Sequence, residues 1–182
     1  TPKYLKYSYK SNINKLKLIN NLQKVIGFPL VVKPLNEGSS VNVFICNKNN
    51  ILKTLAKLNE YGEVLLEKYI PGREIQVAIL ENKVLGAIEL RPTRKFYDYQ
   101  AKYNPKARTE HIIPVEISKR KYQELTKIAL KAHKILNCRG VTRSDFRYYK
   151  NSFYLLETNT QPGMTSLSLV PVSYTHLRAH ET

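Results

Sequence analysis

The stretch "GVTRSDFRYYKNSFYLLETN", residues 140–159, places two strand-like runs on either side of a short polar turn. Because side chains alternate along a strand, Arg143 and Asp145 are predicted to share one face of the first run. In the second run the same alternation assigns four side chains to one face: Phe153, Leu155, Glu157 and Asn159. The stretch therefore predicts an antiparallel hairpin that carries charged and amide side chains.

A three-residue turn at residues 150–152 would place Asp145 opposite Glu157 and Arg143 opposite Asn159. Two carboxylates that face each other at roughly 5 Å repel unless a cation lies between them. Oxygen donors without thiolate or imidazole favour Mg²⁺ or Mn²⁺, and Mg²⁺ usually completes its coordination with phosphates and water. The hairpin therefore predicts a nucleoside triphosphate site. The alternative is an edge hairpin whose carboxylates face solvent and pair with lysines.

The segment "KPLNEGSSV", residues 33–41, could contact phosphates. Lys33 ends a strand as a point charge, and the backbone N–H groups and hydroxyls of the Gly-Ser-Ser loop are phosphate donors. The segment matches neither the GxxxxGKS nor the GxGxxG pattern. The alternative is a flexible hairpin loop.

The segment "LLEKYIPGREIQV", residues 65–77, holds two further candidates around a Pro-Gly turn. Glu67, at a strand end, could read the edge of an adenine, and Glu74, after the turn, could accept hydrogen bonds from ribose hydroxyls. The alternative is that both are surface residues.

The remaining pattern predicts a mixed fold of the α+β class with a largely antiparallel sheet. Helices are expected over residues 14–26, 49–60 and 118–137, strands over residues 29–34, 41–46 and 63–70, and a hairpin over residues 73–90. The apolar stripe of the first helix is predicted at Leu16, Ile19, Leu22 and Ile26.

Composition excludes several classes of protein. The net charge of +16 comes from basic residues spread along the whole chain, so a nucleic-acid-binding surface is not predicted, and a basic nucleic-acid-binding domain stays only as an alternative. No apolar run has the roughly 20 residues that a membrane helix needs, and no signal sequence opens the chain. A cytoplasmic protein without membrane contact is expected. Cys46 and Cys138 fit no zinc spacing and are expected to be reduced thiols.

Five stretches, taken in order, resemble the ATP-grasp fold and more narrowly the D-alanine:D-alanine ligase family. They are "GFPLVVKPLNEGSSV", "LLEKYIPGREIQVAIL", "FYDYQAKY", "GVTRSDF" and "FYLLETNTQPGMTSLSLVP". The resemblance implies two mainly antiparallel α+β subdomains that enclose ATP. The central subdomain would cover residues 1–71 and the C-terminal catalytic subdomain residues 72–171.

The resemblance also assigns ligands for the nucleotide and its metals. Lys33 would contact the phosphates of ATP and Glu74 the ribose, and the adenine would lie against Glu67, Lys68 and Ile70. Two Mg²⁺ or Mn²⁺ ions would be held by Asp145, Glu157 and Asn159, with Glu157 bridging them.

In the implied reaction, the γ-phosphate of ATP passes to the carboxylate of one D-alanine, and the amine of a second D-alanine attacks the acyl phosphate. Arg143 and the backbone N–H of Gly163 would stabilise the oxyanion, and Ser168 would bind the carboxylate of the second D-alanine. In a mobile lid, Lys102 would reach the transferred phosphate and Tyr103 would close on Ser39 to exclude water. Tyr103 favours D-alanine over D-lactate as the acceptor, and a D-alanine:D-lactate type of ligase is the alternative.

Both ends of the sequence depart from the family pattern. The family's N-terminal domain, which binds the first D-alanine, has no counterpart here, so this chain alone is expected to bind Mg-ATP weakly and to turn over little or not at all. Residues 172–182, "VSYTHLRAHET", are expected to be a non-native tail. The intact enzyme is expected to be a homodimer that serves the synthesis of peptidoglycan precursors.

Overall fold

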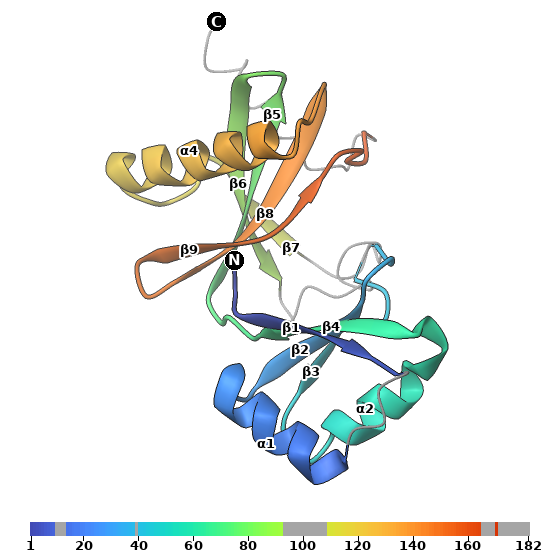
Figure 1. The fold of residues 1–182 in the computed structure, drawn as a ribbon. Helices are drawn as coiled ribbons and strands as arrows, with labels where there is room; N and C mark the ends of the chain where they lie inside the picture. Colours follow the sequence, from blue (N-terminus) through green and yellow to red (C-terminus); the bar gives the residue numbers. More distant parts are fainter. Residues whose placement is uncertain (10–13, 39, 93–108, 165–169, 171–182) are drawn as a thin grey trace, which may run out of the picture. The chain divides into compact units, whose positions relative to one another are not determined.

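The computed structural model describes residues 1–9, 14–38, 40–92, 109–164 and 170 of the chain. These residues form two compact units, a first unit that covers Pro2–Ile70 and a second unit that begins at Pro71. Each unit is an antiparallel sheet with helices on one face (Figure 1), which agrees with the predicted α+β class. None of the helices in the described part of the chain is both long and apolar enough to cross a membrane.

The first unit contains a four-stranded sheet in the order β1-β4-β2-β3. Its strands are β1 (Tyr4–Ser8), β2 (Leu30–Pro34), β3 (Phe44–Cys46) and β4 (Glu63–Lys68). Its helices are α1 (Lys15–Val25), α2 (Ile51–Lys57) and the short 3-10 helix η1 (Asn59–Tyr61). The predicted strand at residues 41–46 and the predicted helix at residues 49–60 are therefore shorter than expected, because turns and the 3-10 helix replace their ends.

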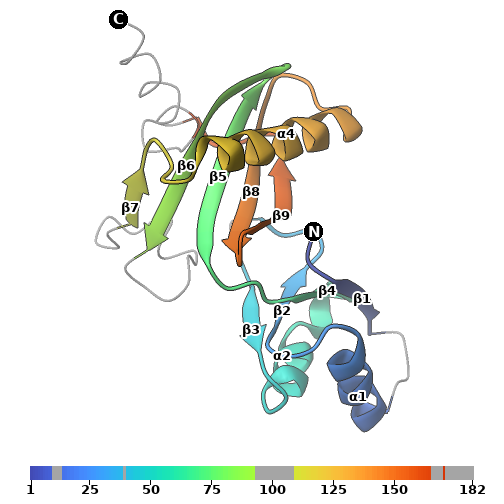
Figure 2. The same cartoon turned by 90° about the vertical axis from the view of Figure 1, so that its left-hand side faces the viewer.

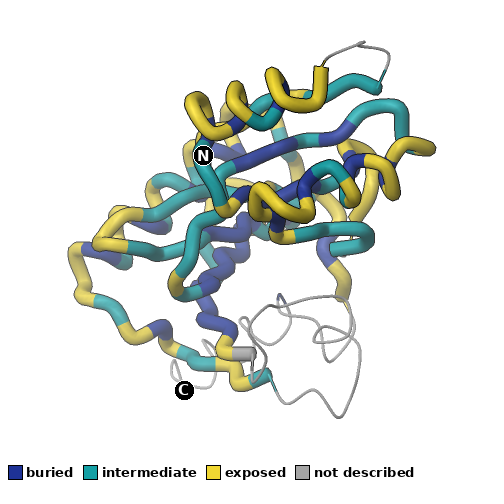
Figure 3. The backbone as a smooth tube through the Cα atoms, turned by 90° about the horizontal axis from the view of Figure 1, so that it is seen from below, coloured by how far each residue is buried: buried dark blue, intermediate teal, exposed yellow. Residues whose placement is uncertain are grey.

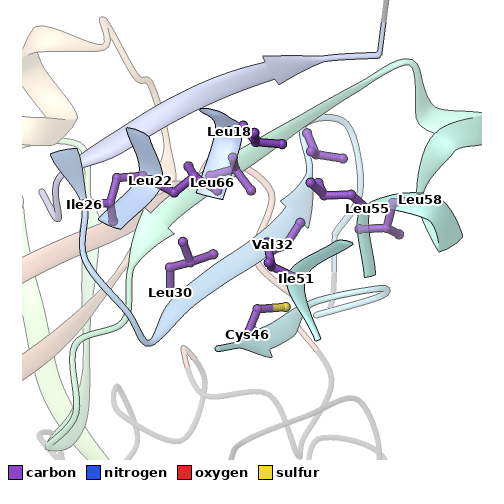
Figure 4. Packing of buried hydrophobic residues seen from close by; sticks show 11 residues of the cluster. Leu18, Leu22, Ile26, Leu30, Val32, Cys46, Ile51, Leu55, Leu58 and Leu66 are labelled. Carbon is purple, nitrogen blue, oxygen red and sulfur yellow. The ribbon is translucent and has the colours of Figure 1, made fainter. Parts of the chain in front are cut away.

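The apolar core of the first unit lies between its sheet and the two α-helices (Figure 4). Leu22, Leu30, Val32 and Ile51 are fully buried there. The predicted stripe of α1 is correct at Leu22 and Ile26 but wrong at Leu16, which is 67% exposed. The side chain of Asn14 caps the helix by accepting hydrogen bonds from the backbone N–H groups of residues 16 and 17, so residue 16 lies in the first turn and Leu18 is buried instead.

The second unit contains a five-stranded sheet in the order β7-β6-β5-β8-β9. Its strands are β5 (Arg73–Leu80), β6 (Lys83–Pro92), β7 (Thr109–Ile112), β8 (Val141–Tyr149) and β9 (Ser152–Asn159). The helix α4 (Lys119–Ile135) lies across one face of this sheet (Figure 2), and its N-cap is Ser118, as predicted. Figure 3 shows buried residues along the strands and exposed residues at intervals along the helices.

The hairpin between β8 and β9 has the predicted register, but its turn is shorter than predicted and one strand contains a bulge. Its turn has two residues, Lys150 and Asn151, with φ of 47° and 63°, so the predicted three-residue turn is wrong. Phe146 pairs with Leu155 whereas Asp145 pairs with Glu157, which leaves Leu156 as the extra residue of a β-bulge. The shorter turn and the bulge offset each other. Asp145 therefore lies opposite Glu157, and Arg143 lies opposite Asn159, as predicted.

The bulge also corrects the predicted faces of β9. Phe153 and Leu155 pack against the apolar cluster that includes residues of α4. Glu157 pairs with Asp145, whose neighbour Phe146 is in that cluster, so the side chain of Glu157 projects to the opposite face. The prediction that Phe153, Leu155, Glu157 and Asn159 share one face is therefore wrong, because Leu156 breaks the alternation between the two pairs.

Candidate functional site

In the first unit, Lys33 and Glu67 lie on the face of the sheet that α1 and α2 leave uncovered. Leu66 belongs to the core between sheet and helices, so its neighbour Glu67 projects to the other side. Lys33 Nζ donates to Glu67 Oε1 over 2.9 Å, and the side chains are 21% and 9% exposed. The carboxylate is thus buried beside a cation that solvent can still reach.

Two other predicted adenine contacts lie at the end of β4. Lys68 is half-buried, and its Nζ donates to the backbone carbonyl of Phe28 over 3.2 Å. Ile70 is half-buried and lies two residues beyond the last residue of the strand. The strand end therefore presents a carboxylate, an ammonium group and backbone beyond the sheet, which are groups that can bind the polar edge of a base.

In the second unit, three paired strands bring Gln76, Asp145 and Glu157 into one row across the sheet. Arg143 holds Asp145 with two hydrogen bonds, from Nε to Oδ1 over 2.7 Å and from Nη2 to Oδ2 over 3.0 Å. Gln76 Nε2 also donates to Asp145 Oδ2, over 3.2 Å. The row lies on the face opposite α4, because Phe146, which follows Asp145, packs in the core.

Glu74 lies on the same face, one alternation before Gln76 on β5. Arg147 forms an ion pair with Glu74 over 3.0 Å and donates to the carbonyl of Gly72 over 3.1 Å. Gly72 has a φ of 110°, and a side chain there would overlap the carbonyl oxygen of Tyr148. The glycine therefore lets the start of β5 pass close to β8, which places Glu74 beside Arg147.

The donors on this face fit Mg²⁺ or Mn²⁺. Asp145, Glu157 and Asn159 offer only oxygen or amide groups, the donors that hard cations prefer. No cluster of three or more His, Cys, Asp or Glu residues that could hold a metal occurs within the described ranges. Two carboxylates and an amide leave coordination positions for phosphate and water, which is the usual way that Mg²⁺ binds together with a nucleotide.

Several predicted site residues cannot be placed. Ser39, Lys102, Tyr103 and Ser168 lie outside the described residues. Gly163 is described and exposed, and it follows a buried proline, Pro162.

The structure adds two residues to the site that the sequence reading missed. Gln76 and Arg147 both lie on the face that carries Asp145, as described above. The signal was present in the sequence: alternation from Glu74 leads to Gln76, and alternation from Asp145 leads to Arg147. Neither residue belongs to a recognised short motif, which is why the pattern was not used.

A buried ion-pair network on the other face of the second sheet was also missed. Glu89 is 1% exposed and accepts hydrogen bonds from Arg73 Nε over 2.8 Å and from Arg91 Nε over 3.1 Å. Burial raises the pKa of Glu89, but the hydrogen bonds from Arg73 and Arg91 outweigh burial, so the pKa is lowered overall. Arg91 also pairs with Glu116 over 2.7 Å. This network lies on the face of the sheet that packs against α4, away from Asp145.

Comparisons with known proteins identify the family. The family model described as "D-ala D-ala ligase C-terminus" matches residues 2–177 of the chain. The D-alanine–D-alanine ligase of Pelagibacter ubique is 62% identical over 171 residues, which are 94% of this chain and 56% of that protein.

Solved structures give the same result for the fold. The crystal structure of D-alanine–D-alanine ligase from Bacillus anthracis has a TM-score of 0.82 and 36% identity, covering 98% of this chain and 57% of that one. A structure of the Bacillus anthracis enzyme complexed with ATP has a TM-score of 0.78 and 33% identity, covering 98% of this chain and 56% of that one. The chain therefore spans somewhat more than half the length of these relatives.

Proposed function

The chain belongs to the D-alanine–D-alanine ligase family and matches its C-terminal region, and from this we propose that it is the ATP-binding part of an enzyme that joins two D-alanines. The single observation that carries the proposal is the row of Asp145 and Glu157 on the face of the second sheet opposite α4, flanked by Arg143 and Asn159. The product would be D-alanyl-D-alanine, a precursor of peptidoglycan. The whole enzyme would act in the cytoplasm as a homodimer.

We propose that the first unit binds the base and phosphates of ATP through residues at the ends of β2 and β4. The carboxylate of Glu67 would accept a hydrogen bond from the adenine amino group, and Lys68 and Ile70 would lie beside the ring. Lys33 would turn from Glu67 toward the phosphates, where its charge offsets theirs. The partly exposed 2.9 Å ion pair of Lys33 and Glu67 supports this role, because solvent or a ligand can reach the ammonium group.

The second unit would hold the metal ions and the ribose. Asp145, Glu157 and Asn159 would bind two Mg²⁺ or Mn²⁺ ions, which supply positive charge that cancels the repulsion between triphosphate and substrate carboxylate. Glu157 would bridge the two ions. Glu74 would accept hydrogen bonds from ribose hydroxyls, and its ion pair with Arg147 keeps the carboxylate oriented on the sheet.

The reaction would proceed in two steps. A carboxylate oxygen of the first D-alanine attacks the γ-phosphorus, the bond to the β,γ-bridging oxygen breaks, and ADP leaves. The amine of the second D-alanine attacks the acyl carbon, loses a proton and expels inorganic phosphate. Arg143 and the backbone N–H of Gly163 would donate hydrogen bonds to the tetrahedral oxyanion. Ser168 would bind the second substrate, and Lys102, Tyr103 and Ser39 would close over the phosphate.

Thermal unfolding of the chain with and without Mg-ATP tests the binding part of this proposal. A ligand that binds only the folded state must raise the melting temperature. Glu157→Gln should weaken Mg-ATP binding by more than about tenfold, since it removes a charged metal ligand. Glu110→Gln is the matched control, because Glu110 is an exposed glutamate on β7 of the same sheet. Equal stabilisation of the wild type and both variants would contradict the metal site.

The ligase activity itself requires the intact enzyme. Phosphate release from ATP should depend on D-alanine, and D-lactate should stimulate it less at neutral pH. A preference for D-lactate would contradict D-alanine as the acceptor but would not contradict the proposed metal site. Robust D-alanine-dependent release by the 182-residue chain alone would contradict the expectation that this chain does not turn over.

A further inference from the structure

Gln76 is a buried amide at the centre of the metal-binding face that the proposed reaction does not use. It lies on β5 directly opposite Asp145 of β8, and on its other side it pairs with Ile88 of β6. Its side chain is fully buried, with 1% of the residue exposed. Its position in the row makes it the neighbour of Asp145 on the side away from Glu157.

The two ends of the Gln76 amide differ in their environment. Nε2 donates to Asp145 Oδ2 over 3.2 Å. Oε1 is a buried acceptor for which the described residues provide no hydrogen-bond donor. A buried acceptor without a donor loses its bond to water and gains nothing in return, so proteins rarely keep one without a use.

The side chains around Gln76 in the described part of the chain explain why Oε1 has no donor among them. On this face the paired neighbours of Gln76 are Ile88, which is apolar, and Asp145, whose carboxylate accepts hydrogen bonds. The two arginines of the face donate to carboxylates, Arg143 to Asp145 and Arg147 to Glu74. Within the described residues Oε1 therefore has no donor, and a bound ligand can supply one.

We propose that Gln76 is a positioning residue of the metal site, holding Asp145 through Nε2 and accepting a hydrogen bond at Oε1 from a water molecule bound to Mg²⁺. The inference rests on the proposed function, because it needs a cation at Asp145. It fits the chemistry of Mg²⁺, which keeps several of its waters when few protein ligands bind it. Partners that orient metal ligands in this way contribute about 10- to 100-fold to metal affinity.

The test compares Gln76→Met with Ile88→Met in the 182-residue chain. Both variants place a methionine in the same buried row on adjacent strands, but only the first removes the amide. Mn²⁺ affinity is measured from the electron paramagnetic resonance signal of the free ion, and the melting temperature is measured without metal. Gln76→Met should weaken Mn²⁺ binding about tenfold and leave the metal-free melting temperature unchanged or raised, whereas Ile88→Met should leave Mn²⁺ affinity unchanged.

The possible failures are distinguishable. A wild-type chain that does not bind Mn²⁺ would overturn the metal site and this inference with it. If the wild type binds Mn²⁺ and Gln76→Met binds it equally well, only the role of Gln76 is overturned, because a purely structural glutamine changes stability without changing affinity. If Gln76→Met does not fold, Gln76→Asn is tested instead. Asparagine keeps the amide but is one methylene shorter, so it should not reach both partners. Wild-type Mn²⁺ affinity in Gln76→Asn would overturn the inference.

Discussion

The two units share an architecture but differ in what they bury. Within the described residues of the first unit, Glu67 is the one buried charged or polar side chain, and the core is otherwise aliphatic with a single thiol. Among its own described residues, the second unit buries eight: Glu74, Gln76, Glu89, Lys121, His133, Thr142, Ser144 and Asp145. Burial of a polar group is tolerated only when it is partnered or used. The second unit thus combines a packing core with buried polar groups, some of which, such as Glu74 and Asp145, take part in the proposed chemistry.

The strongest test of this difference is insertion of one alanine between Leu156, the extra residue of the bulge in β9, and Glu157. With the bulge kept, the alanine would pair with Asp145 and Glu157 with Ser144, which places Glu157 on the side of Phe153 and Leu155, against the apolar cluster. We expect Mn²⁺ binding to disappear, and the unfolding free energy to fall by roughly 3–5 kcal/mol if the charge becomes buried without a partner. Electron paramagnetic resonance and urea unfolding measure the two effects.

Leu156→Ala is the control for the insertion, because it changes the side chain of the bulge residue but keeps the number of residues and therefore the register. It should retain Mn²⁺ binding. Unchanged Mn²⁺ binding in the insertion variant would mean that the register of β9 does not decide which face Glu157 occupies.

A smaller effect is expected when Glu89→Gln removes the charge at the centre of the Arg73 and Arg91 network. The loss should be about 1–3 kcal/mol near neutral pH, because two arginines lose a charged acceptor in a buried position. The pKa of Glu89 is lowered in the folded protein, so its stabilising contribution is present above the unfolded pKa of about 4.3 and disappears as the pH falls through the folded pKa. The difference between wild type and variant should therefore shrink below about pH 4.

Hydrogen exchange measured peptide by peptide shows where in the chain Glu89→Gln lowers stability. Protection should fall in the strands of the second unit and stay unchanged in the first unit, whose core contains no comparable ion-pair network among the described residues. An equal loss of protection at pH 3 and pH 7 would show that ionisation of Glu89 does not stabilise the fold.

The smallest effects are expected at the helix caps, a feature in which the two units are alike. Asn14 caps α1 and Ser118 caps α4, each through a side-chain oxygen that accepts backbone N–H bonds. Asn14→Ala and Ser118→Ala should each lower stability by about 1 kcal/mol, measured as hydrogen exchange in the first turn of the corresponding helix. Ser118→Asp keeps a capping oxygen and should retain protection. A loss in one helix only would mean that the two units differ in their helices as well as in their cores.

Local patterns in the sequence predicted the secondary-structure elements and which site residues face each other across the strands. They did not predict the turn and the bulge that produce this pairing. Alternation and turn residues were enough to place the hairpin of β5 and β6. The pairing of Asp145 with Glu157 was predicted from a three-residue turn, which the structure replaces with a two-residue turn and a bulge. The turn at Lys150 and Asn151 was misjudged because two residues with positive φ are sterically allowed there, although neither is glycine. The bulge at Leu156 has no local signal, because it depends on packing of Phe153 and Leu155 against residues far away in sequence.

Burial was harder to predict than pairing. Leu16 satisfies the apolar period of α1 but lies in the first turn, where the cap rather than the period decides which side chains reach the sheet. Gln76 looks like an ordinary polar residue of a strand, and only the ladders on both sides show that it is enclosed. Such cases depend on tertiary contacts, which single-strand periodicity does not contain.

The two-residue turn before β9 is fixed from several sides. Lys121 Nζ, at the start of α4, donates to the carbonyl of Asn151 over 2.6 Å, and the Tyr148 hydroxyl donates to Asn151 Oδ1 over 2.9 Å. The same number of residues between Asp145 and Glu157 fits either a two-residue turn with a bulge or a three-residue turn without one. The contacts of Asn151 with α4 and β8 therefore decide which of the two arrangements the hairpin adopts.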